Sequence, residues 1–376
     1  MRSKHILIPV SLFFGSRLII LLGVLFSTYL APNPGLPDIP AINADILLHW
    51  DAGWYRGIAE SGYSWTNDPN AQQNIIFFPL YPFLSGMLHK ITGASVAVSM
   101  IVISNAAFLI SLIWLYRYLY EEYTEDIALW SAVFISFFPT SMFFSSGYPE
   151  SLSLLFSIAT FHYLSKNKPL AAGVMAGIAT LTRLPLIILA VPIFIHLLRK
   201  RPYTARHILF SCACLLLSVG GVIVYAAYLY LKFKDPLVFV KGYEAWKPFN
   251  QGEGNLLKIL AFVPVIQDIK FHFARLSART FDSIFFIFFL ISSVWGVLQY
   301  RKPIFVYALV IILFSYVSHA QFSLISMGRY MLLAFPVFIL MTQIFRGTVP
   351  RLVVLSLSSA MLFMHTVFFA KWYWAG

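Results

Sequence analysis

The sequence predicts an all-α protein that crosses a membrane many times. Of its 376 residues, 59% are hydrophobic and only 11% are charged, whereas about 25% of an ordinary soluble domain is charged. Apolar runs of roughly 20 residues recur along the chain, each long enough to cross the hydrocarbon layer as a helix. The net charge of +12 comes from short Lys and Arg clusters between these runs, as in topology determinants. A soluble protein is excluded, and nucleic acid is not an expected partner.

The first apolar run, residues 6–30, is expected to remain as a transmembrane helix, because no small-residue cleavage site interrupts it. Arg2 and Lys4 place its start in the cytoplasm, so the loop at 31–93 is external. About eleven crossings are expected in all. The other ten lie near 94–116, 127–145, 149–165, 169–183, 185–198, 207–231, 280–299, 303–319, 331–345 and 351–370.

The basic clusters between these crossings are expected to lie in the cytoplasm; they are Arg117, Lys166, Lys168, 199–206, Arg301, Lys302, Arg346 and Arg351. A second external loop is expected at 232–279. The absence of a repeat or low-complexity tract indicates one membrane domain covering residues 1–376.

The first external loop contains two segments that are expected to lie on the membrane. From Asn43 to Ser61, apolar and aromatic residues recur at helical spacing, which predicts an interfacial helix. Residues 77–92 are short and interrupted by proline, so a re-entrant or interfacial helix is preferred over a crossing. If they did cross, every later basic cluster would lie outside, against the positive-inside pattern.

Asp51 is the best candidate for a general base. A carboxylate beside Trp50 and Trp54 at a membrane surface is partly desolvated and can accept a proton from a hydroxyl group. The alternative is that Asp51 caps or solvates the interfacial helix. Asp45 and Glu60 are rival candidates, although their spacing is more typical of the polar face of that helix.

Arg183 and Arg329 both stand beside apolar helices on the expected external side, where an unpaired charge is costly. Arg329 is expected at the N-terminal edge of the 331–345 helix, where guanidinium and helix-end amides would form an anion site suited to a lipid-linked phosphate. The alternative for each arginine is interfacial snorkelling. Glu150 opens a helix, where the dipole favours a carboxylate anyway, so a functional role and a capping role are both open.

Arg17 is the one charge expected well inside a helix, where it either pairs with an acid or snorkels. A transporter would carry more such charges at mid-helix. His49 stands next to Trp50, where histidine is more often a packing or hydrogen-bonding residue than a base. Metal-binding, P-loop and serine-hydrolase motifs are absent from the sequence, so neither a metal nor another cofactor is expected.

Several blocks of the sequence resemble, in order, those of the PIG-V mannosyltransferase family. They are HWDAGWYRGIAESGY (49–63), FFPLYPFL (77–84), FFPTSMFFSSGYPESLSLLF (137–156), AGVMAGIATLTRLPLIIL (172–189) and SMGRYMLLAFPVF (326–338). They extend from the first external loop to near residue 340, so the resemblance spans most of the chain. The resemblance implies the GT-C glycosyltransferase fold, an acidic residue in the first external loop and a polyprenyl-phosphate-mannose donor, in a bacterial relative of the family.

The resemblance also implies site residues. The catalytic carboxylate falls on Asp51, and the donor phosphate would be held by Arg329, Arg183 or both. Asp51 would take the proton of the acceptor hydroxyl in a single inverting displacement. The remaining residues implied or expected to contact substrate are His49, Trp50, Trp54, Tyr55, Glu150 and Tyr330.

The expected partners are a lipid-linked sugar donor, a glycolipid or glycan acceptor, and membrane lipids. The expected location is a bacterial plasma membrane, or the endoplasmic reticulum in a eukaryote, with the site on the external or lumenal face. Two alternatives stay open. One is a GT-C transferase with a different sugar donor, and the other is a flippase or transporter of lipid-linked sugars.

Overall fold

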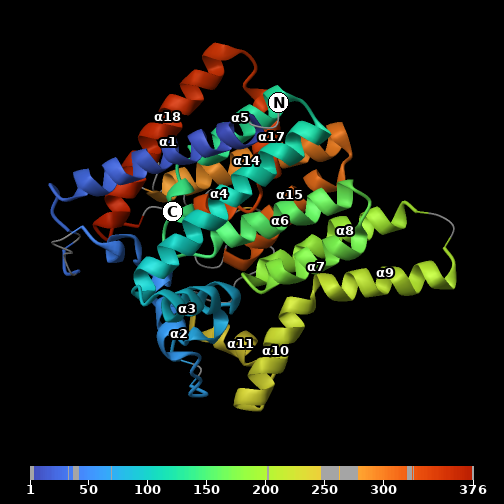
Figure 1. Cartoon of the computed structure of the whole chain (residues 1–376), viewed down its shortest axis with the longest axis horizontal. Coiled ribbons are helices and arrows are strands. Elements are labelled where there is room, and N and C mark those ends of the chain that lie inside the picture. Colours follow the sequence, from blue (N-terminus) through green and yellow to red (C-terminus); the bar gives the residue numbers. More distant parts are fainter. Residues whose placement is uncertain are drawn as a thin grey trace.

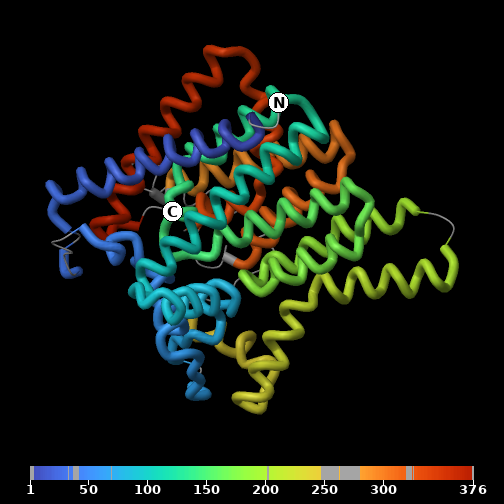
Figure 2. The backbone as a smooth tube through the Cα atoms, viewed as in Figure 1, coloured from blue at the N-terminus to red at the C-terminus, as the bar shows by residue number. Residues whose placement is uncertain are grey.

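The predicted all-α architecture is confirmed over the part of the chain that the computed structural model describes, where every regular element is a helix (Figures 1 and 2). The described residues are 4–32, 34–36, 42–68, 70–200, 203–246, 262, 278–319, 324 and 326–374.

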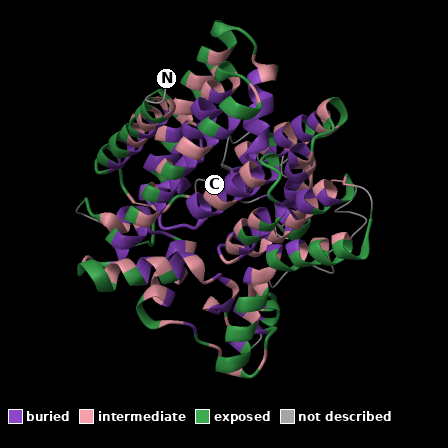
Figure 3. Ribbon diagram, turned by 45° about the vertical axis from the view of Figure 1, so that its right-hand side comes forward, coloured by how far each residue is buried: buried purple, intermediate pink, exposed green. Residues whose placement is uncertain are grey.

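Four helices among these residues are long and apolar enough to cross a membrane. They are α1 (Lys4–Ser27), α4 (Val96–Glu122), α14 (Ala278–Tyr300) and α18 (Thr348–Ala370). A fifth crossing is made if α9 (Ala205–Ser218) and α10 (Gly220–Phe233), bent by 58°, act as one span. Exposed residues follow the outer helices (Figure 3). Large apolar side chains are among them, such as Phe14 on α1 and Leu357 on α18. Such surfaces suit lipid rather than water, and the chain is a multi-pass integral membrane protein.

Six further helices are shorter than a full crossing, which takes about 20 residues. They are α5 (Glu125–Ser136), α6 (Glu150–Ser165), α7 (Pro169–Thr180), α8 (Ala190–Leu198), α15 (Pro303–His319) and α17 (Pro336–Ile344). The count of about eleven crossings therefore stays a prediction.

Four predicted helices were wrong as continuous elements. The one at 207–231 is divided into α9 and α10. The one at 127–145 ends at Ser136, ahead of Pro139, and a 3₁₀ helix η3 (Ser141–Phe144) follows. The one at 331–345 is divided into α16 (Met327–Met331) and α17, whose first residue is Pro336, since proline favours a first helical position over an interior one. The one at 185–198 begins as a 3₁₀ helix, η4 (Leu184–Leu189), before α8.

The predicted interfacial helix over Asn43–Ser61 is likewise two elements, the 3₁₀ helix η1 (Ala44–Leu47) and α2 (Asp51–Ser61). The segment at 77–92 contains α3 (Leu80–Thr92), which has 13 residues and packs on α2 and α4. The short helices η2 (Asn74–Ile76), α11 (Val238–Gly242) and η5 (Tyr243–Trp246) lie near α2 and α3 (Figure 1). Most of the predicted loop at 232–279 falls outside the described residues.

Several of the basic groups predicted to be cytoplasmic contact neighbouring acids or the backbone of another basic residue. Lys166 lies 2.8 Å from Glu121, a guanidinium nitrogen of Arg199 donates to the carbonyl of Arg301, and Arg351 forms a 2.7 Å ion pair with Asp126. These contacts join the helix ends that are distant from α2 and α3 (Figure 1). Which end faces the cytoplasm stays a prediction.

Candidate active site

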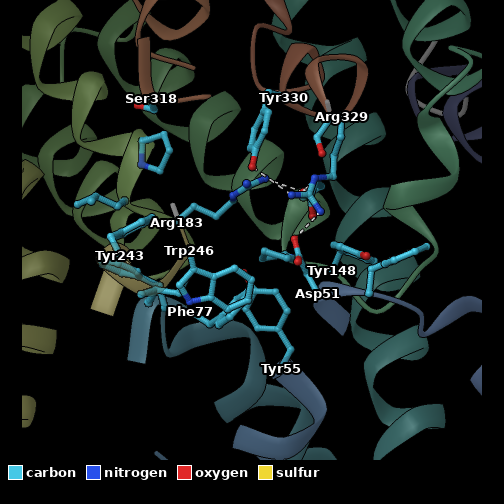
Figure 4. A pocket seen from close by; sticks show the side chains of 18 of the residues that line it. Asp51, Tyr55, Phe77, Tyr148, Arg183, Tyr243, Trp246, Ser318, Arg329 and Tyr330 are labelled. Carbon is cyan, nitrogen blue, oxygen red and sulfur yellow. Dashed lines mark hydrogen bonds and ion pairs between the residues drawn. The ribbon is translucent and has the colours of Figure 1, made fainter. Parts of the chain in front are cut away.

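A cavity of about 1020 Å³ opens where α2, the start of α6, the turn after α7 and the segment around α16 come together (Figure 4). Its charged side chains are those of Asp51, Glu150, Arg183 and Arg329. Its lining also includes Trp50, Tyr55, Asn70, Gln72, Phe77, Tyr148, Tyr243, Trp246, Ser318, Tyr330 and Trp374.

Asp51 is the first residue of α2, and the turn at 146–148 fixes how the chain enters this helix. The Tyr148 hydroxyl donates to the carbonyl of His49 (2.8 Å), and the Gly147 amide donates to the carbonyl of Leu47 (3.2 Å). A Cβ on Gly147 would come within 2.9 Å of Leu48, so the close approach requires glycine. Trp50 has φ 57° and ψ −123°, a region costly for a side-chain-bearing residue and found where a functional site is held under constraint.

Glu150 bridges the two arginines predicted to bind phosphate. It begins α6, and its side chain is fully buried. One oxygen, Oε1, lies 2.6 Å from Nη1 of Arg183 and 3.5 Å from Nε of Arg329. The other oxygen has no hydrogen-bond partner among the described residues. Glu150 is thus more than a helix cap, because it holds two cations at one point.

Arg329 links this pair to Asp51. Its Nη1 donates to Oδ2 of Asp51 at 2.8 Å, and its Nη2 donates to the Tyr330 hydroxyl at 3.2 Å (Figure 4). The Arg329 side chain is 3% exposed, whereas that of Asp51 is 28% exposed. The contacts therefore form an alternating series, Arg183–Glu150–Arg329–Asp51, and Asp51 is its solvent-accessible end.

Aromatic rings surround both guanidinium groups. The Arg183 guanidinium lies 4.8 Å from the Tyr330 ring centre, and that of Arg329 lies 5.1 Å from the rings of Tyr330 and Tyr148. Burial alone would lower the pKa of each arginine. The charges of the neighbouring carboxylates, Glu150 for Arg183 and Asp51 with Glu150 for Arg329, outweigh burial and raise both pKa values. Both arginines are fixed cations, held in place before any ligand arrives.

The prediction that Arg329 stands at the N-terminal edge of a helix spanning 331–345 is wrong. Arg329 lies within α16, a helix of five residues, and α17 begins only at Pro336. Any anion bound here would contact the guanidinium group and not the amides of that helix. Snorkelling is also excluded for Arg329, since its side chain is buried and ion-paired.

The rival carboxylates lie elsewhere. Asp45 and Glu60 both form 2.8 Å ion pairs with Arg56, and all three side chains are more than 40% exposed. Neither carboxylate lines the cavity. The structure thus separates Asp51 from the polar face of its own helix.

Trp50 and Tyr55 line the cavity, as expected of substrate-binding residues, but His49 and Trp54 do not. His49 is buried, and its ring stacks on Trp372 at 3.8 Å. Burial lowers the pKa of His49 to about 4, so it fits the packing role better than a proton-transfer role. The Trp54 ring stacks on that of Phe77, which lines the cavity.

Sequence reasoning missed several cavity residues. Tyr148 lies two residues before Glu150, and Trp374 belongs to a C-terminal pair that is typical of an interface anchor.

Asp282, which lies outside the cavity lining, was also missed. It is the last acidic residue of the sequence and opens an apolar run, which is itself a signal, because such a charge needs partners.

Arg17 forms no ion pair with an acid among the described residues, and its guanidinium group packs inside the protein instead of snorkelling. Its Nη2 donates to the Ser141 hydroxyl at 2.9 Å, and its guanidinium lies 4.5 Å from the Phe108 ring centre. This is a packed position, apart from the cavity. Within the described ranges, no three His, Cys, Asp or Glu side chains come together as a metal site would require.

A charge-lined cavity of this size in a membrane protein is a candidate substrate-binding site. Residues 78–230 match the family model of dolichyl-phosphate-mannose-protein mannosyltransferases. The match includes Glu150 and Arg183 but not Asp51 or Arg329. This segment, less than half of the chain, is therefore similar to a family of mannosyltransferases that is named for a lipid-phosphate sugar.

Solved structures of the archaeal oligosaccharyltransferase AglB from Archaeoglobus fulgidus are similar to the chain at low identity. The complex with an inhibitory peptide and a dolichol-phosphate has 13% identity and a TM-score of 0.48, covering 98% of this chain and 56% of that one. The apo form has 13% identity and a TM-score of 0.46, covering 96% and 56%.

The chain therefore spans about half the length of these structures. Likeness at this level does not transfer their activity. The search of curated proteins returned no match.

Proposed function

We propose that the protein transfers a mannosyl residue from a polyprenyl phosphate to a hydroxyl group of a glycolipid or glycan, on the external face of the membrane. The observation that carries the proposal is the ion pair between Asp51 and Arg329 at the cavity, with Arg183 joined to it through Glu150. A base and two phosphate-binding groups thus share one site. The resemblance to the PIG-V family supports mannose as the sugar.

In the proposed reaction, the acceptor oxygen attacks the anomeric carbon of the sugar while the bond to the phosphate oxygen breaks. The acceptor proton passes to Asp51. Oδ2 of Asp51 accepts from Arg329, and the side chain is accessible from the cavity, so Oδ1 is the oxygen suited to take the proton. A single displacement of this kind inverts the anomeric centre.

The charges of the site would balance the departing phosphate. Two guanidinium groups face two carboxylates, so the set is neutral when both acids are ionised. When Asp51 takes up a proton, Arg329 loses one of its two anionic partners just as the phosphate gains a negative charge. Arg329, with Arg183 beside it, can then stabilise the leaving group, and the fixed positions of both arginines limit the reorganisation required.

The cavity walls suit the rest of the substrate. A volume of about 1020 Å³ is at the upper end of the range for ligand sites, which is enough for a sugar phosphate together with an acceptor. Trp50, Tyr55, Phe77 and Trp246 offer aromatic surface to a sugar ring or to the first part of the lipid. Glu150 holds the two arginines in place.

The test is the release of polyprenyl phosphate from polyprenyl-phosphate mannose by purified protein, with a membrane lipid extract as the acceptor source. Asp51→Asn should reduce turnover by about 10²–10⁴-fold, the usual contribution of a general base, and leave the folded protein intact. Glu60→Gln, on the same helix, is the matched control and should turn over normally. Retained turnover in Asp51→Asn would exclude Asp51 as the base, and glucosyl and arabinosyl donors would test the other sugars.

A further inference from the structure

We propose that Asp282 is a positioning residue that sets the place of Arg329, an inference that rests on the proposed role of Arg329. Asp282 lies in the first turns of α14 and is 2% exposed. It does not line the cavity. Its carboxylate instead contacts the backbone just before Arg329.

The two oxygens of Asp282 each accept a backbone hydrogen bond from this segment. Oδ1 lies 2.6 Å from the amide of Gly328, and Oδ2 lies 3.2 Å from the amide of Ser326. Hydrogen bonds to a charged acceptor are shorter and stronger than neutral ones. A carboxylate, which only accepts, suits two converging N–H groups better than an amide does.

The segment is also held from its other side. The Thr140 hydroxyl donates to the carbonyl of Gly328 at 2.8 Å. A Cβ on Gly328 would come within 2.9 Å of Thr140 Cγ2 and 3.1 Å of Asp282 Oδ1, so only glycine fits between them. Ser326 has φ 73°, in the left-handed region, a conformation that persists where surrounding contacts enforce it.

The consequence concerns the guanidinium group one residue further on. Arg329 must reach Asp51 at 2.8 Å and Glu150 at 3.5 Å together, from a helix of only five residues. So short a helix has little rigidity of its own. The Asp282 carboxylate supplies the rigidity by fixing Ser326 and Gly328 to the long helix α14.

Three variants test this assignment. Asp282→Leu removes both acceptors at similar volume. Asp282→Asn keeps one acceptor but turns an N–H₂ group toward the other amide. Ser283→Ala is the control, because the Ser283 hydroxyl on the same helix is buried without a hydrogen-bond partner among the described residues. Turnover of polyprenyl-phosphate mannose and hydrogen exchange of the Gly328 amide are measured on each.

We expect kcat/KM to fall about 100-fold in Asp282→Leu and about 10-fold in Asp282→Asn, since a misplacement of about 1 Å has effects of that size. Ser283→Ala should stay within about twofold of wild type, as is usual away from such contacts. The Gly328 amide should exchange faster in both Asp282 variants. In an Arg329→Ala background, Asp282→Leu should cause no further loss, because it acts through Arg329.

The inference is overturned if Asp282→Leu has the same kcat/KM as Ser283→Ala. It is also overturned if the double variant with Arg329→Ala loses kcat/KM by the product of the two single losses. If Asp282→Leu fails to fold, Asp282→Asn decides in the same way. If Arg329→Ala itself turns over normally, the proposed role of Arg329 fails. Amide exchange then decides separately, and unchanged protection of Gly328 in the Asp282 variants would exclude positioning.

Discussion

The segment around α2 carries two ion-pair clusters of similar composition that differ in almost every other respect. On one face, Arg56 pairs with Asp45 and Glu60, and all three side chains are more than 40% exposed. On the other, Asp51 pairs with Arg329, whose side chain is 3% exposed. The exposed cluster joins neighbours in the sequence, whereas the buried one joins residues 278 positions apart. The residue types in a cluster therefore do not identify a functional site. The burial of the charged side chains and the identity of their partners do.

The physical difference between the clusters is how far their charged groups are hydrated. Exposed pairs are screened and mobile, and contribute about 0–1 kcal/mol. Buried cations and anions have lost their hydration and depend on one another for compensation. A lipid phosphate can enter the second kind of cluster as a replacement anion, while the first kind has bulk water as its alternative partner.

The largest effect expected from this comparison is that of Arg329→Lys. An ammonium group is a point charge and cannot contact Asp51, Glu150 and the Tyr330 hydroxyl together, as the guanidinium group does. We expect kcat/KM for polyprenyl phosphate release to fall about 100-fold, as for the loss of one transition-state donor. Arg56→Lys is the matched control and should match wild type. Equal turnover in the two lysine variants would remove the distinction between the clusters.

An intermediate effect is expected for Glu150→Gln. The amide oxygen can still accept from Arg183, but the negative charge between the two guanidinium groups is lost. We expect the free energy of unfolding to fall by about 1–3 kcal/mol, seen as a lower thermal midpoint in detergent. Glu60→Gln should lower it by less than about 1 kcal/mol.

Added polyprenyl phosphate sharpens the same measurement. An anion that takes the place of the lost carboxylate charge should raise the midpoint of Glu150→Gln more than that of wild type, because ligand binding stabilises only the folded state. An equal shift in the two proteins would mean that the phosphate does not bind between Arg183 and Arg329.

The sequence was sufficient for the parts of the molecule that depend on local pattern. Hydrophobic run length predicted the all-α class, and the aromatic, acidic first loop singled out Asp51. Helix continuity was predicted less well, because run length alone did not mark the breaks ahead of Pro139 and at Pro336. That Asp51 and Arg329 serve one site was expected only from the resemblance, since no local pattern joins residues 278 positions apart.

Asp282 shows the limit more sharply. Its function depends on two backbone amides at Ser326 and Gly328, and backbone groups carry no signature in a sequence. His49 shows the opposite case. The sequence already favoured packing or hydrogen bonding over proton transfer for this residue, and its ring stacks on Trp372.

The smallest effect is expected for Arg56→Gln, which removes both exposed ion pairs at once. The two pairs are screened by solvent and salt, so the free energy of unfolding should change by less than about 1 kcal/mol and turnover should not change. The change should also shrink further between about 0.05 M and 0.5 M salt, because the Debye length falls below the spacing of surface charges. A loss of turnover in Arg56→Gln would mean that the exposed face of α2 holds Asp51 in place, and the two clusters would then have to be treated as one coupled network across the helix.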